Sequence, residues 1–279
     1  MPKLAIFDVD GTIAKSGEFP RSVVKGFQRL HQLGYTTTVS TGRGYIRAKE
    51  AFGEHFDQLI SDDALLLLEH GTKITDKKGN TVFIEEFSAA ELDHIVDFVR
   101  ANINLFEIGW YNPNDPKRKP EIWVIDQKDL AAVTEKRGYY ANIWHSSITE
   151  FKQRLTSEVL SNVTLRLKPH VKVHNLKLAL TRTDMHIIFQ DDNMEFVKSN
   201  TNKALAILYL MKHLGVSYAD VLVAGNAIND IEMLDLEVGR RILVGPKDER
   251  DTVLAYLSAV DGVIQVPSPE HLGLYLQKL

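Results

Sequence analysis

The chain has 279 residues, and its 33 basic and 37 acidic side chains give a formal net charge of −4. This balance argues against nucleic acid or an anionic membrane as the main partner. The content of 44% hydrophobic and 25% charged residues is typical of a globular protein. The absence of Cys excludes disulfides, thiolate catalysis and cysteine-ligated metals.

The apolar runs of the chain are far shorter than the ~20 residues that span a bilayer. No signal-peptide pattern opens the sequence, because Met1-Pro2-Lys3 leads directly into a strand-like run. We therefore expect a cytoplasmic protein that does not associate with membranes. The length suits two domains, or one domain with a large insertion.

The first predicted elements alternate between strand and helix. Residues 4–7 form an apolar run, the apolar residues over 23–33 have helical spacing, and residues 35–39 form a second run. This order is typical of a parallel sheet with helices on both faces. It returns late in the chain, with a helix over 204–214 followed by Gly215 and strands at 221–224 and 242–244. The two ends therefore predict one Rossmann-like, doubly wound α/β sheet.

The middle of the chain has a different pattern. Residues 60–83 alternate around a turn at 76–80, which predicts a β-hairpin. Further predicted elements are helices at 91–101 and 147–159, strands at 122–125, 163–167 and 185–189, and a proline-rich loop over 112–120. We therefore predict a core of residues 1–84 and 198–279, interrupted by an α+β domain over residues 85–197.

Two acidic residues follow the first predicted strand, in Asp8-Val9-Asp10-Gly11-Thr12. Residues two apart in a strand share a side, and open α/β sheets bind ligands at the carboxyl ends of their strands. Both carboxylates should therefore face one site, where they need a cation or a shared proton. With Mg²⁺ bound, Asp8 suits a nucleophile and Asp10 a proton donor and acceptor. The same residues also fit a plain turn with a helix N-cap.

Three further polar groups follow predicted strands or begin a helix. The segment Ser-Thr-Gly-Arg at 40–43 offers a hydroxyl and backbone N–H groups to a phosphoryl group, or simply caps a helix. Lys203 begins the late helix, where a positive charge is the less expected sign and favours an anion. The segment Gly-Asn-Ala-Ile-Asn-Asp at 225–230 follows the strand at 221–224, with its polar groups on one side of the turn.

The order of these four motifs around a long insert closely resembles the haloacid dehalogenase superfamily of phosphohydrolases. The arrangement is similar to its Cof-type members, which are related to sucrose-phosphate and mannosyl-3-phosphoglycerate phosphatases. The resemblance covers nearly the whole chain. It implies that the insert is a large α/β cap domain and that the protein is a phosphoric monoester hydrolase.

The resemblance also implies roles for individual residues. Asp8 becomes the nucleophile that forms an aspartyl-phosphate, and Asp10 the acid that protonates the leaving group and then activates water. The implied phosphate-binding residues are Thr41, Gly42, Lys203 and Asn229. The implied Mg²⁺ ligands are Asp8, the Asp10 backbone carbonyl, Asn226 and Asp230.

One residue departs from the family pattern. The fourth motif normally begins Gly-Asp, whereas this chain has Asn226 after Gly225. An amide oxygen can coordinate Mg²⁺, but the loss of one negative charge predicts weaker binding, for which Asp230 is a candidate to compensate. Three interpretations stay open: a working enzyme with an altered metal demand, a phosphate-binding or regulatory protein without turnover, and an engineered substitution.

Substrate recognition is expected to fall partly on the insert. Basic side chains meet acidic groups and aromatic rings stack on sugars, which favours Trp110 and Tyr111 next to a basic loop. The candidate substrate-binding residues are Arg43, Lys117, Arg118, Arg166 and Lys168. A solvated basic surface explains the insert residues equally simply. We expect a Mg²⁺-dependent phosphatase for a small phosphate ester, favour a sugar phosphate, and expect a monomer or a homodimer. Phosphoryl transfer between substrates is a further alternative.

Overall fold

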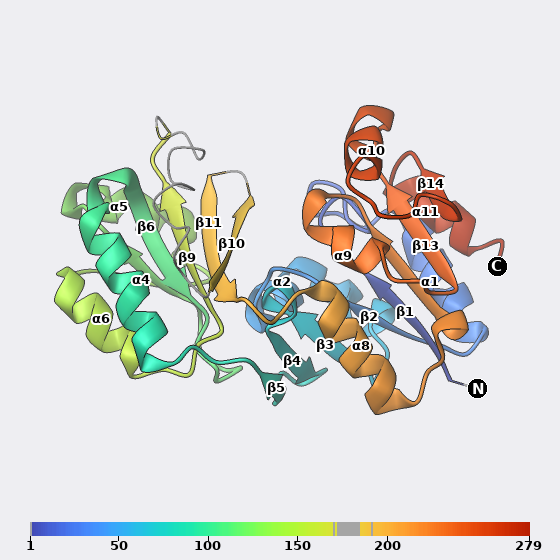
Figure 1. Ribbon diagram of the computed structural model, residues 1–279, viewed down its shortest axis with the longest axis horizontal. Coiled ribbons are helices and arrows are strands. Elements are labelled where there is room, and N and C mark those ends of the chain that lie inside the picture. Colours follow the sequence, from blue (N-terminus) through green and yellow to red (C-terminus); the bar gives the residue numbers. More distant parts are fainter. Residues whose placement is uncertain (1, 170, 172–184, 191) are drawn as a thin grey trace. The chain divides into compact units, whose positions relative to one another are not determined.

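The computed structural model describes residues 2–169, 171, 185–190 and 192–279, and the chain forms two compact units (Figure 1). The first unit contains Met1–Phe83 and Asn202–Leu279, and the second contains Ile84–Thr201. The second unit begins one residue earlier and ends four residues later than the predicted insert. After the last strand of that unit, the Thr201 amide donates to Lys198 O and closes a turn at the end of the unit.

The first unit is built on five parallel strands in the order β14-β13-β12-β1-β2. Their bounds are β1 (Lys3–Phe7), β2 (Tyr35–Val39), β12 (Val221–Gly225), β13 (Arg240–Val244) and β14 (Val263–Val266). The helices of this unit are α1 (Arg21–Gln32), α2 (Tyr45–Phe52), α3 (Phe56–Leu59), α8 (Lys203–Leu214), α9 (Ile231–Leu234), α10 (Lys247–Leu254) and α11 (Pro269–Leu276). The predicted α/β fold with a parallel sheet is confirmed.

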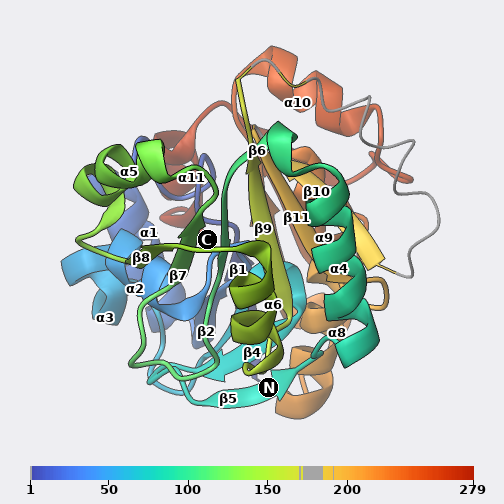
Figure 2. The ribbon, with the colours of Figure 1, turned by 90° about the vertical axis from the view of Figure 1, so that its left-hand side faces the viewer.

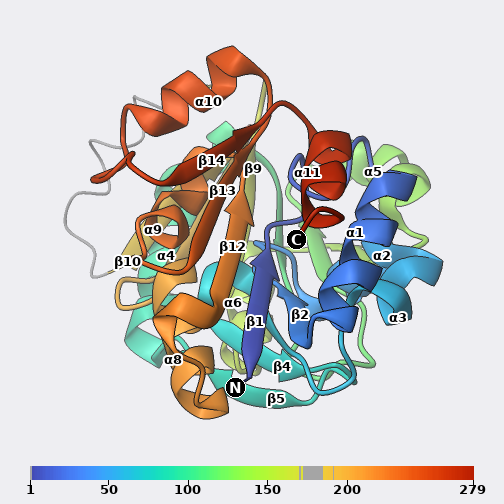
Figure 3. The same ribbon diagram turned by 90° about the vertical axis from the view of Figure 1, so that its right-hand side faces the viewer.

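Hydrophobic cores cover both faces of this sheet. Successive residues of β1 point to opposite faces, so Ala5 and Phe7 pack into one core while Leu4 and Ile6 pack into the other. Helices α1 and α11 lie on one face, and α8 and α9 lie on the other (Figure 3). This two-sided burial explains why the sequences of these strands are continuously apolar. Helix α8 ends at Gly215, whose φ of 64° is left-handed, as its position after the apolar stripe predicted.

The prediction of a β-hairpin over residues 60–83 is incomplete, because the structure has one more strand there. The structure has a three-stranded sheet of β3 (Leu65–Leu68), β4 (Lys73–Asp76) and β5 (Thr81–Ile84). The turn between β4 and β5 is the predicted one, but β3 adds a third, antiparallel strand. Since β3 is apolar throughout and buried, its sequence shows no alternation that separates it from a helix segment. A bridge from Ser40 to Leu67 joins β3 to the end of β2.

The second unit is a six-stranded mixed sheet in the order β10-β11-β9-β6-β7-β8. Its strands are β6 (Phe106–Tyr111), β7 (Glu121–Val124), β8 (Asn142–His145), β9 (Asn162–Leu167), β10 (Met185–Gln190) and β11 (Asn193–Lys198). Helices α4 (Ala89–Ala101) and α6 (Ile148–Thr156) share one core with the sheet (Figure 2), and α5 (Leu130–Arg137) belongs to another. The predicted loop over 112–120 joins β6 to β7.

Short 3-10 helices complete the two units. They lie at Gly53–His55, Glu69–Gly71, Tyr218–Asp220 and Ile228–Asp230 in the first unit, and at Ile103–Leu105 and Gln127–Asp129 in the second. Within the described ranges, none of the helices combines the length and the apolar character needed to cross a membrane.

Candidate active site

Loops that follow three neighbouring strands form the candidate site of the first unit. Strand β1 lies between β2 and β12, so the segments after these strands leave the same edge of the sheet. Backbone hydrogen bonds join them, because the Asp8 amide donates to Ala224 O at 2.9 Å and the Ser40 amide donates to Phe7 O at 2.9 Å. The central loop carries both Asp8 and Asp10.

A buried lysine bridges two carboxylates at this edge. Lys203 is the first residue of α8 and is 1% exposed. Its Nζ donates to Asp8 Oδ1 at 2.8 Å and to Asp230 Oδ1 at 2.6 Å. Burial alone would lower the pKa of Lys203, but the Asp230 and Asp8 carboxylates outweigh it and raise that pKa. Lys203 therefore stays a fixed cation in the pocket.

The surroundings of Asp8 disfavour the charged form of its carboxyl, whereas those of Lys203 favour the charged form of its amine. Burial, followed by the nearby Asp230 carboxylate, raises the pKa of Asp8 from 3.8 to about 6, and the attraction of Lys203 only partly offsets this rise. One lysine is shared by two buried carboxylates, so a net negative charge stays in the pocket. A carboxylate in such surroundings is ionised at neutral pH but poorly solvated, which suits a nucleophile.

Asp230, which the resemblance implies as a Mg²⁺ ligand, accepts hydrogen bonds from groups of the protein. It is fully buried, and while its Oδ1 accepts from Lys203, its Oδ2 accepts from the backbone amides of Asn226 at 2.9 Å and Ala227 at 3.1 Å. Both carboxylate oxygens are thus engaged by protein donors. Asp230 thus holds Lys203 and the turn after β12, and its part in metal binding stays a prediction.

Asp10 is held by Arg43. The guanidinium donates from Nε to Asp10 Oδ2 and from Nη2 to Asp10 Oδ1, both at 2.8 Å. Burial lowers the pKa of Arg43, but the hydrogen bonds and charge of Asp10 outweigh this effect and raise it. The Asp10 side chain is 50% exposed, so it faces the open side of the site. Arg43, predicted to bind substrate, here orients the predicted proton donor.

The Asn226 carboxamide lies against the same loop. One of its terminal atoms is 3.0 Å from the Asp10 backbone oxygen, 3.1 Å from Thr12 Oγ1 and 3.3 Å from Asp8 Oδ2. Thr12 is fully buried and donates to Asp8 Oδ2 at 3.2 Å. The sequence analysis assigned Thr12 no role, although its place four residues after Asp8 is a usable signal.

The loop after β2 is supported from β3. The Thr41 amide donates to Leu67 O at 2.9 Å, and the His70 amide donates to Thr41 O at 3.1 Å. A Cβ on Gly42 would lie 2.4 Å from His70 Nε2, so only glycine fits between the loop and this imidazole. His70 has a φ of 59°, which is unusual for a residue other than glycine. No sequence pattern pointed to His70.

Asn229 has an open acceptor. Within the described part of the chain, its buried Oδ1 has no hydrogen-bond partner, and neither has the buried Ser40 Oγ. Buried polar atoms without partners are costly and few in native proteins, so a missing ligand or water is the usual explanation. The open atom is an acceptor and so would need a donor partner; the phosphate-binding role of Asn229 stays a prediction.

The predicted substrate residues of the insert belong to the second unit. Arg118 forms ion pairs with Glu158 at 2.6 Å and Glu121 at 3.4 Å, and Arg166 lies 3.5 Å from Glu107 and 3.8 Å from Asp192. Both guanidinium groups therefore have protein partners already.

Three other residues of the insert differ in exposure. Lys117 is exposed and Lys168 is half-buried. The suggestion that Tyr111 stacks on a sugar is wrong, because Tyr111 is 2% exposed and packs in the core beneath β6. The roles of Lys117, Arg118, Arg166 and Lys168 in substrate binding stay predictions.

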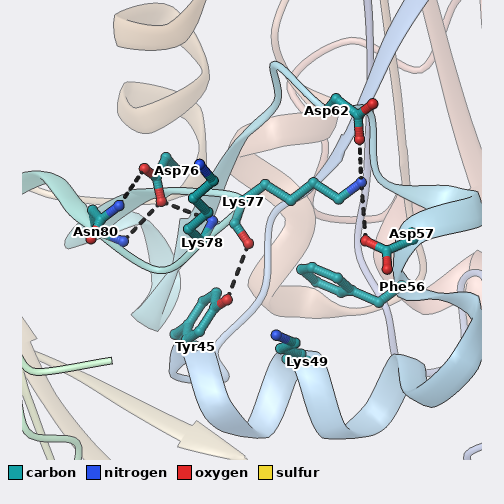
Figure 4. A pocket seen from close by; sticks show the side chains of 9 residues that line it. All are labelled: Tyr45, Lys49, Phe56, Asp57, Asp62, Asp76, Lys77, Lys78 and Asn80. Carbon is teal, nitrogen blue, oxygen red and sulfur yellow. Dashed lines mark hydrogen bonds and ion pairs between the residues drawn. The ribbon is translucent and has the colours of Figure 1, made fainter. Parts of the chain in front are cut away.

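A second hollow lies elsewhere on the first unit, between α2 and the β4–β5 turn (Figure 4). Its volume is about 690 Å³. Its central amine, Lys77 Nζ, is paired with Asp62 at 2.8 Å and Asp57 at 3.3 Å, and the Tyr45 hydroxyl donates to Lys77 O. The Lys77 amine is therefore already paired with carboxylates of the protein.

Comparison with known proteins identifies the family. The model of the haloacid dehalogenase-like hydrolases matches residues 5–250, and the chain belongs to this family. A protein of Cronobacter sakazakii named HMP-PP phosphatase is 27% identical over 256 residues, which cover 88% of this chain and 85% of that protein. The chain is therefore a haloacid dehalogenase-like hydrolase, and its likeness to a protein named as a phosphatase supports a phosphoric monoester hydrolase.

Solved structures share the fold. A putative HAD/Cof-like hydrolase from Plasmodium vivax has a TM-score of 0.76 at 21% identity, covering 99% of this chain and 94% of its own. A sugar phosphatase of HAD subclass IIB has a TM-score of 0.76 at 15% identity, covering 99% and 98%. Both likenesses extend over the two units of the chain.

Enzymes of this superfamily are generally metal-dependent, and a hard cation such as Mg²⁺ requires oxygen ligands. The oxygens at the site are the Asp8 carboxylate, the Asp10 backbone carbonyl and the Asn226 carboxamide, which are ligand types that suit Mg²⁺. Among the described residues, no group of three or more His, Cys, Asp or Glu side chains is placed to hold a metal ion. The donor chemistry fits a divalent cation, but with fewer charged ligands than an Asp at position 226 would provide.

Proposed function

We propose that the protein hydrolyses a small phosphorylated metabolite, in the class of sugar phosphates, through an aspartyl-phosphate on Asp8. The observation that carries this proposal is the buried Lys203 bridge, which sets an ionisable carboxylate beside a fixed cation at the carboxyl edge of the sheet. The similarity to a protein named HMP-PP phosphatase and the shared fold with a sugar phosphatase support the choice of substrate class.

The first step transfers the phosphoryl group to Asp8. A carboxylate oxygen of Asp8 attacks phosphorus, the bond from phosphorus to the ester oxygen breaks, and the leaving alkoxide takes a proton from Asp10. In the second step Asp10 accepts a proton from water, the water oxygen attacks phosphorus, and the bond to Asp8 breaks to release inorganic phosphate. Arg43 keeps the Asp10 carboxyl oriented for both transfers.

The remaining residues bind the phosphoryl group. Lys203 offsets its negative charge, and the Thr41 hydroxyl, the Gly42 amide and the Asn229 side chain offer hydrogen bonds. Mg²⁺, held by Asp8, the Asp10 carbonyl and the Asn226 amide oxygen, would draw charge from the phosphoryl oxygens when bound. We place the reaction in the cytoplasm and expect a monomer or a homodimer.

The test is hydrolysis of an aryl phosphate and of a panel of sugar phosphates, with and without MgCl₂. We expect Asp8→Asn to lower kcat by a factor on the order of 10³ or more. Asp63→Asn, an exposed residue away from the site, is the matched control and should keep full activity. Activity that survives in Asp8→Asn would contradict the proposed nucleophile.

Asn226 also favours a second candidate, a phosphate-binding protein without turnover. In that case the protein would bind inorganic phosphate in a calorimeter but hydrolyse none of the esters, whether or not MgCl₂ is present. Hydrolysis by the unmodified protein that is lost in Asp8→Asn would exclude this candidate.

A further inference from the structure

We infer that the Asn226 carboxamide stands in for a divalent cation in the free protein, so that the pocket is assembled without metal. The inference concerns the side chains of the first unit alone. It does not depend on which substrate is used or on whether the protein turns it over.

The amide occupies the place where a cation would bridge two ligands. The Asp8 carboxylate and the Asp10 backbone carbonyl are the oxygens that would hold a cation. One terminal atom of Asn226 contacts both of them, 3.3 Å from Asp8 Oδ2 and 3.0 Å from Asp10 O. These are hydrogen-bond distances, whereas Mg²⁺ would bind each oxygen at about 2.1 Å.

The hydrogen-bonding pattern identifies this atom as the amide nitrogen. With the oxygen in its place, the oxygen would face only acceptors and the nitrogen only donors. With the nitrogen there, it donates to Asp10 O, Thr12 Oγ1 and Asp8 Oδ2, and Thr12 in turn donates to Asp8 Oδ2. The amide nitrogen thus provides the partial positive charge that these oxygens require.

An aspartate at position 226 would repel the oxygens to which the Asn226 amide nitrogen donates. Its carboxylate would lie beside Asp8 Oδ2 and the Asp10 carbonyl, with no hydrogen to donate to either. Asp8 and Asp230 already share the single cation Lys203, so a third carboxylate would raise the local charge from about −1 to about −2. A bound cation, or a proton shared between the carboxylates, would be needed to relieve this repulsion. Asparagine therefore removes the need for metal in holding the pocket together.

A direct consequence concerns metal affinity. Before the amide oxygen can coordinate Mg²⁺, the carboxamide must turn over and give up its hydrogen bonds to the Asp8 and Asp10 oxygens. Mg²⁺ by itself should then bind weakly and leave the stability of the free protein unchanged. In an Asn226→Asp variant, Mg²⁺ should bind tightly and stabilise the fold.

The experiment is thermal unfolding of the full chain, followed by far-ultraviolet circular dichroism in EDTA and in millimolar MgCl₂, with calorimetric titration of MgCl₂ alone. For the unmodified protein we expect the same Tm in both solutions and no measurable heat of Mg²⁺ binding. For Asn226→Asp we expect a lower Tm in EDTA and a rise of about 5 to 10 °C when Mg²⁺ is near 100 times its Kd. Gln28→Glu makes the same amide-to-carboxylate change on the exposed face of α1 and should show no response to Mg²⁺.

Asn226→Ala keeps the inference testable if the aspartate variant does not fold. Alanine removes the amide donors, so we expect a lower Tm in EDTA than for the unmodified protein. An unchanged Tm in Asn226→Ala would overturn the inference. So would a Mg²⁺-dependent rise in the Tm of the unmodified protein as large as that of Asn226→Asp.

Discussion

At the scale of single residues, the site depends on how three charges are shared in a buried volume. Lys203 lies between Asp8 and Asp230, and both carboxylates accept further hydrogen bonds, Asp230 from the Asn226 and Ala227 amides and Asp8 from the Thr12 hydroxyl. Asp230 is held by backbone groups, whereas burial and the Asp230 charge raise the pKa of Asp8. This asymmetry separates a structural carboxylate from a reactive one although both contact the same amine.

The raised pKa of Asp8 predicts a pH dependence of stability in the metal-free protein. The folded-state pKa of about 6 lies above the ordinary value of 3.8, so protonated Asp8 favours the fold. This contribution is fully present below pH 3.8 and is lost as the pH rises through about 6. We expect Asp8→Asn to gain about 1.4 kcal/mol relative to the unmodified protein between pH 5 and pH 8. Denaturant unfolding in EDTA across this range measures the difference, and parallel curves for the two proteins would contradict it.

The Asp10–Arg43 pair predicts a loss of rate without a loss of stability. Arg43→Lys cannot form two parallel hydrogen bonds to Asp10, so the proton donor loses its fixed orientation. We expect kcat for an aryl phosphate to fall about tenfold, while the free energy of unfolding changes by less than about 1 kcal/mol. Arg47→Lys, whose side chain lies 3.8 Å from Glu50, is the matched control. Equal kcat values for the two variants would show that Arg43 does not position Asp10.

At the scale of elements, the loop after β2 is set by its contact with the segment after β3. The Thr41 amide donates to Leu67 O in β3, and the His70 amide donates to Thr41 O. The His70 imidazole also leaves no room for a Cβ on Gly42. The loop predicted to bind phosphate is thus shaped by residues that follow a different strand. Its conformation depends on tertiary contacts rather than on its own sequence.

Gly42→Ala should therefore disturb the loop. The new Cβ would lie 2.4 Å from His70 Nε2, and overpacking of this kind costs about 1 to 3 kcal/mol. We expect weaker binding of inorganic phosphate together with this loss of stability. The double variant Gly42→Ala/His70→Ala should lose less stability than the sum of the two single variants, because the clash is gone. Strict additivity in denaturant unfolding would rule out this contact.

At the scale of the whole molecule, the chain has two units with separate hydrophobic cores. The chemistry-bearing residues Asp8, Asp10, Lys203 and Asn226 all belong to the first unit, whereas the three tryptophans, Trp110, Trp123 and Trp144, all belong to the second. Tryptophan fluorescence therefore reports on the second unit alone, and circular dichroism reports on both.

A substitution in the first unit should separate the two signals. A Cβ on Gly273 would lie 2.3 Å from the Ser22 and Val23 backbone, where α11 packs against α1. We expect Gly273→Ala to lower the midpoint of the circular dichroism transition in denaturant and to leave the tryptophan fluorescence midpoint unchanged. Leu274→Ala, at an exposed neighbour, should change neither. An equal shift of both midpoints in Gly273→Ala would mean that the units unfold as one.

Much of the first unit could be predicted because its signals are local. The apolar runs at 4–7, 35–39 and 221–224 became β1, β2 and β12, and the helical spacing before Gly215 became α8. Among the strands that were missed, β6 is interrupted by Gly109, β8 has only four residues, and β11 follows closely after β10 as the second strand of an antiparallel pair. Their strand conformation depends on pairing with segments distant in sequence, which periodicity does not record.

The sequence by itself determined the parallel-sheet fold, the family resemblance and the set of polar residues at the strand ends, because spacing and motif order are properties of the chain. The tertiary structure decided which atoms pair: Asp230 with Lys203, Asp10 with Arg43, and the Asn226 amide with the Asp8 and Asp10 oxygens. These partners lie 27, 33 and more than 200 positions apart, so their hydrogen bonds exist only once the sheet has brought its loops to one edge.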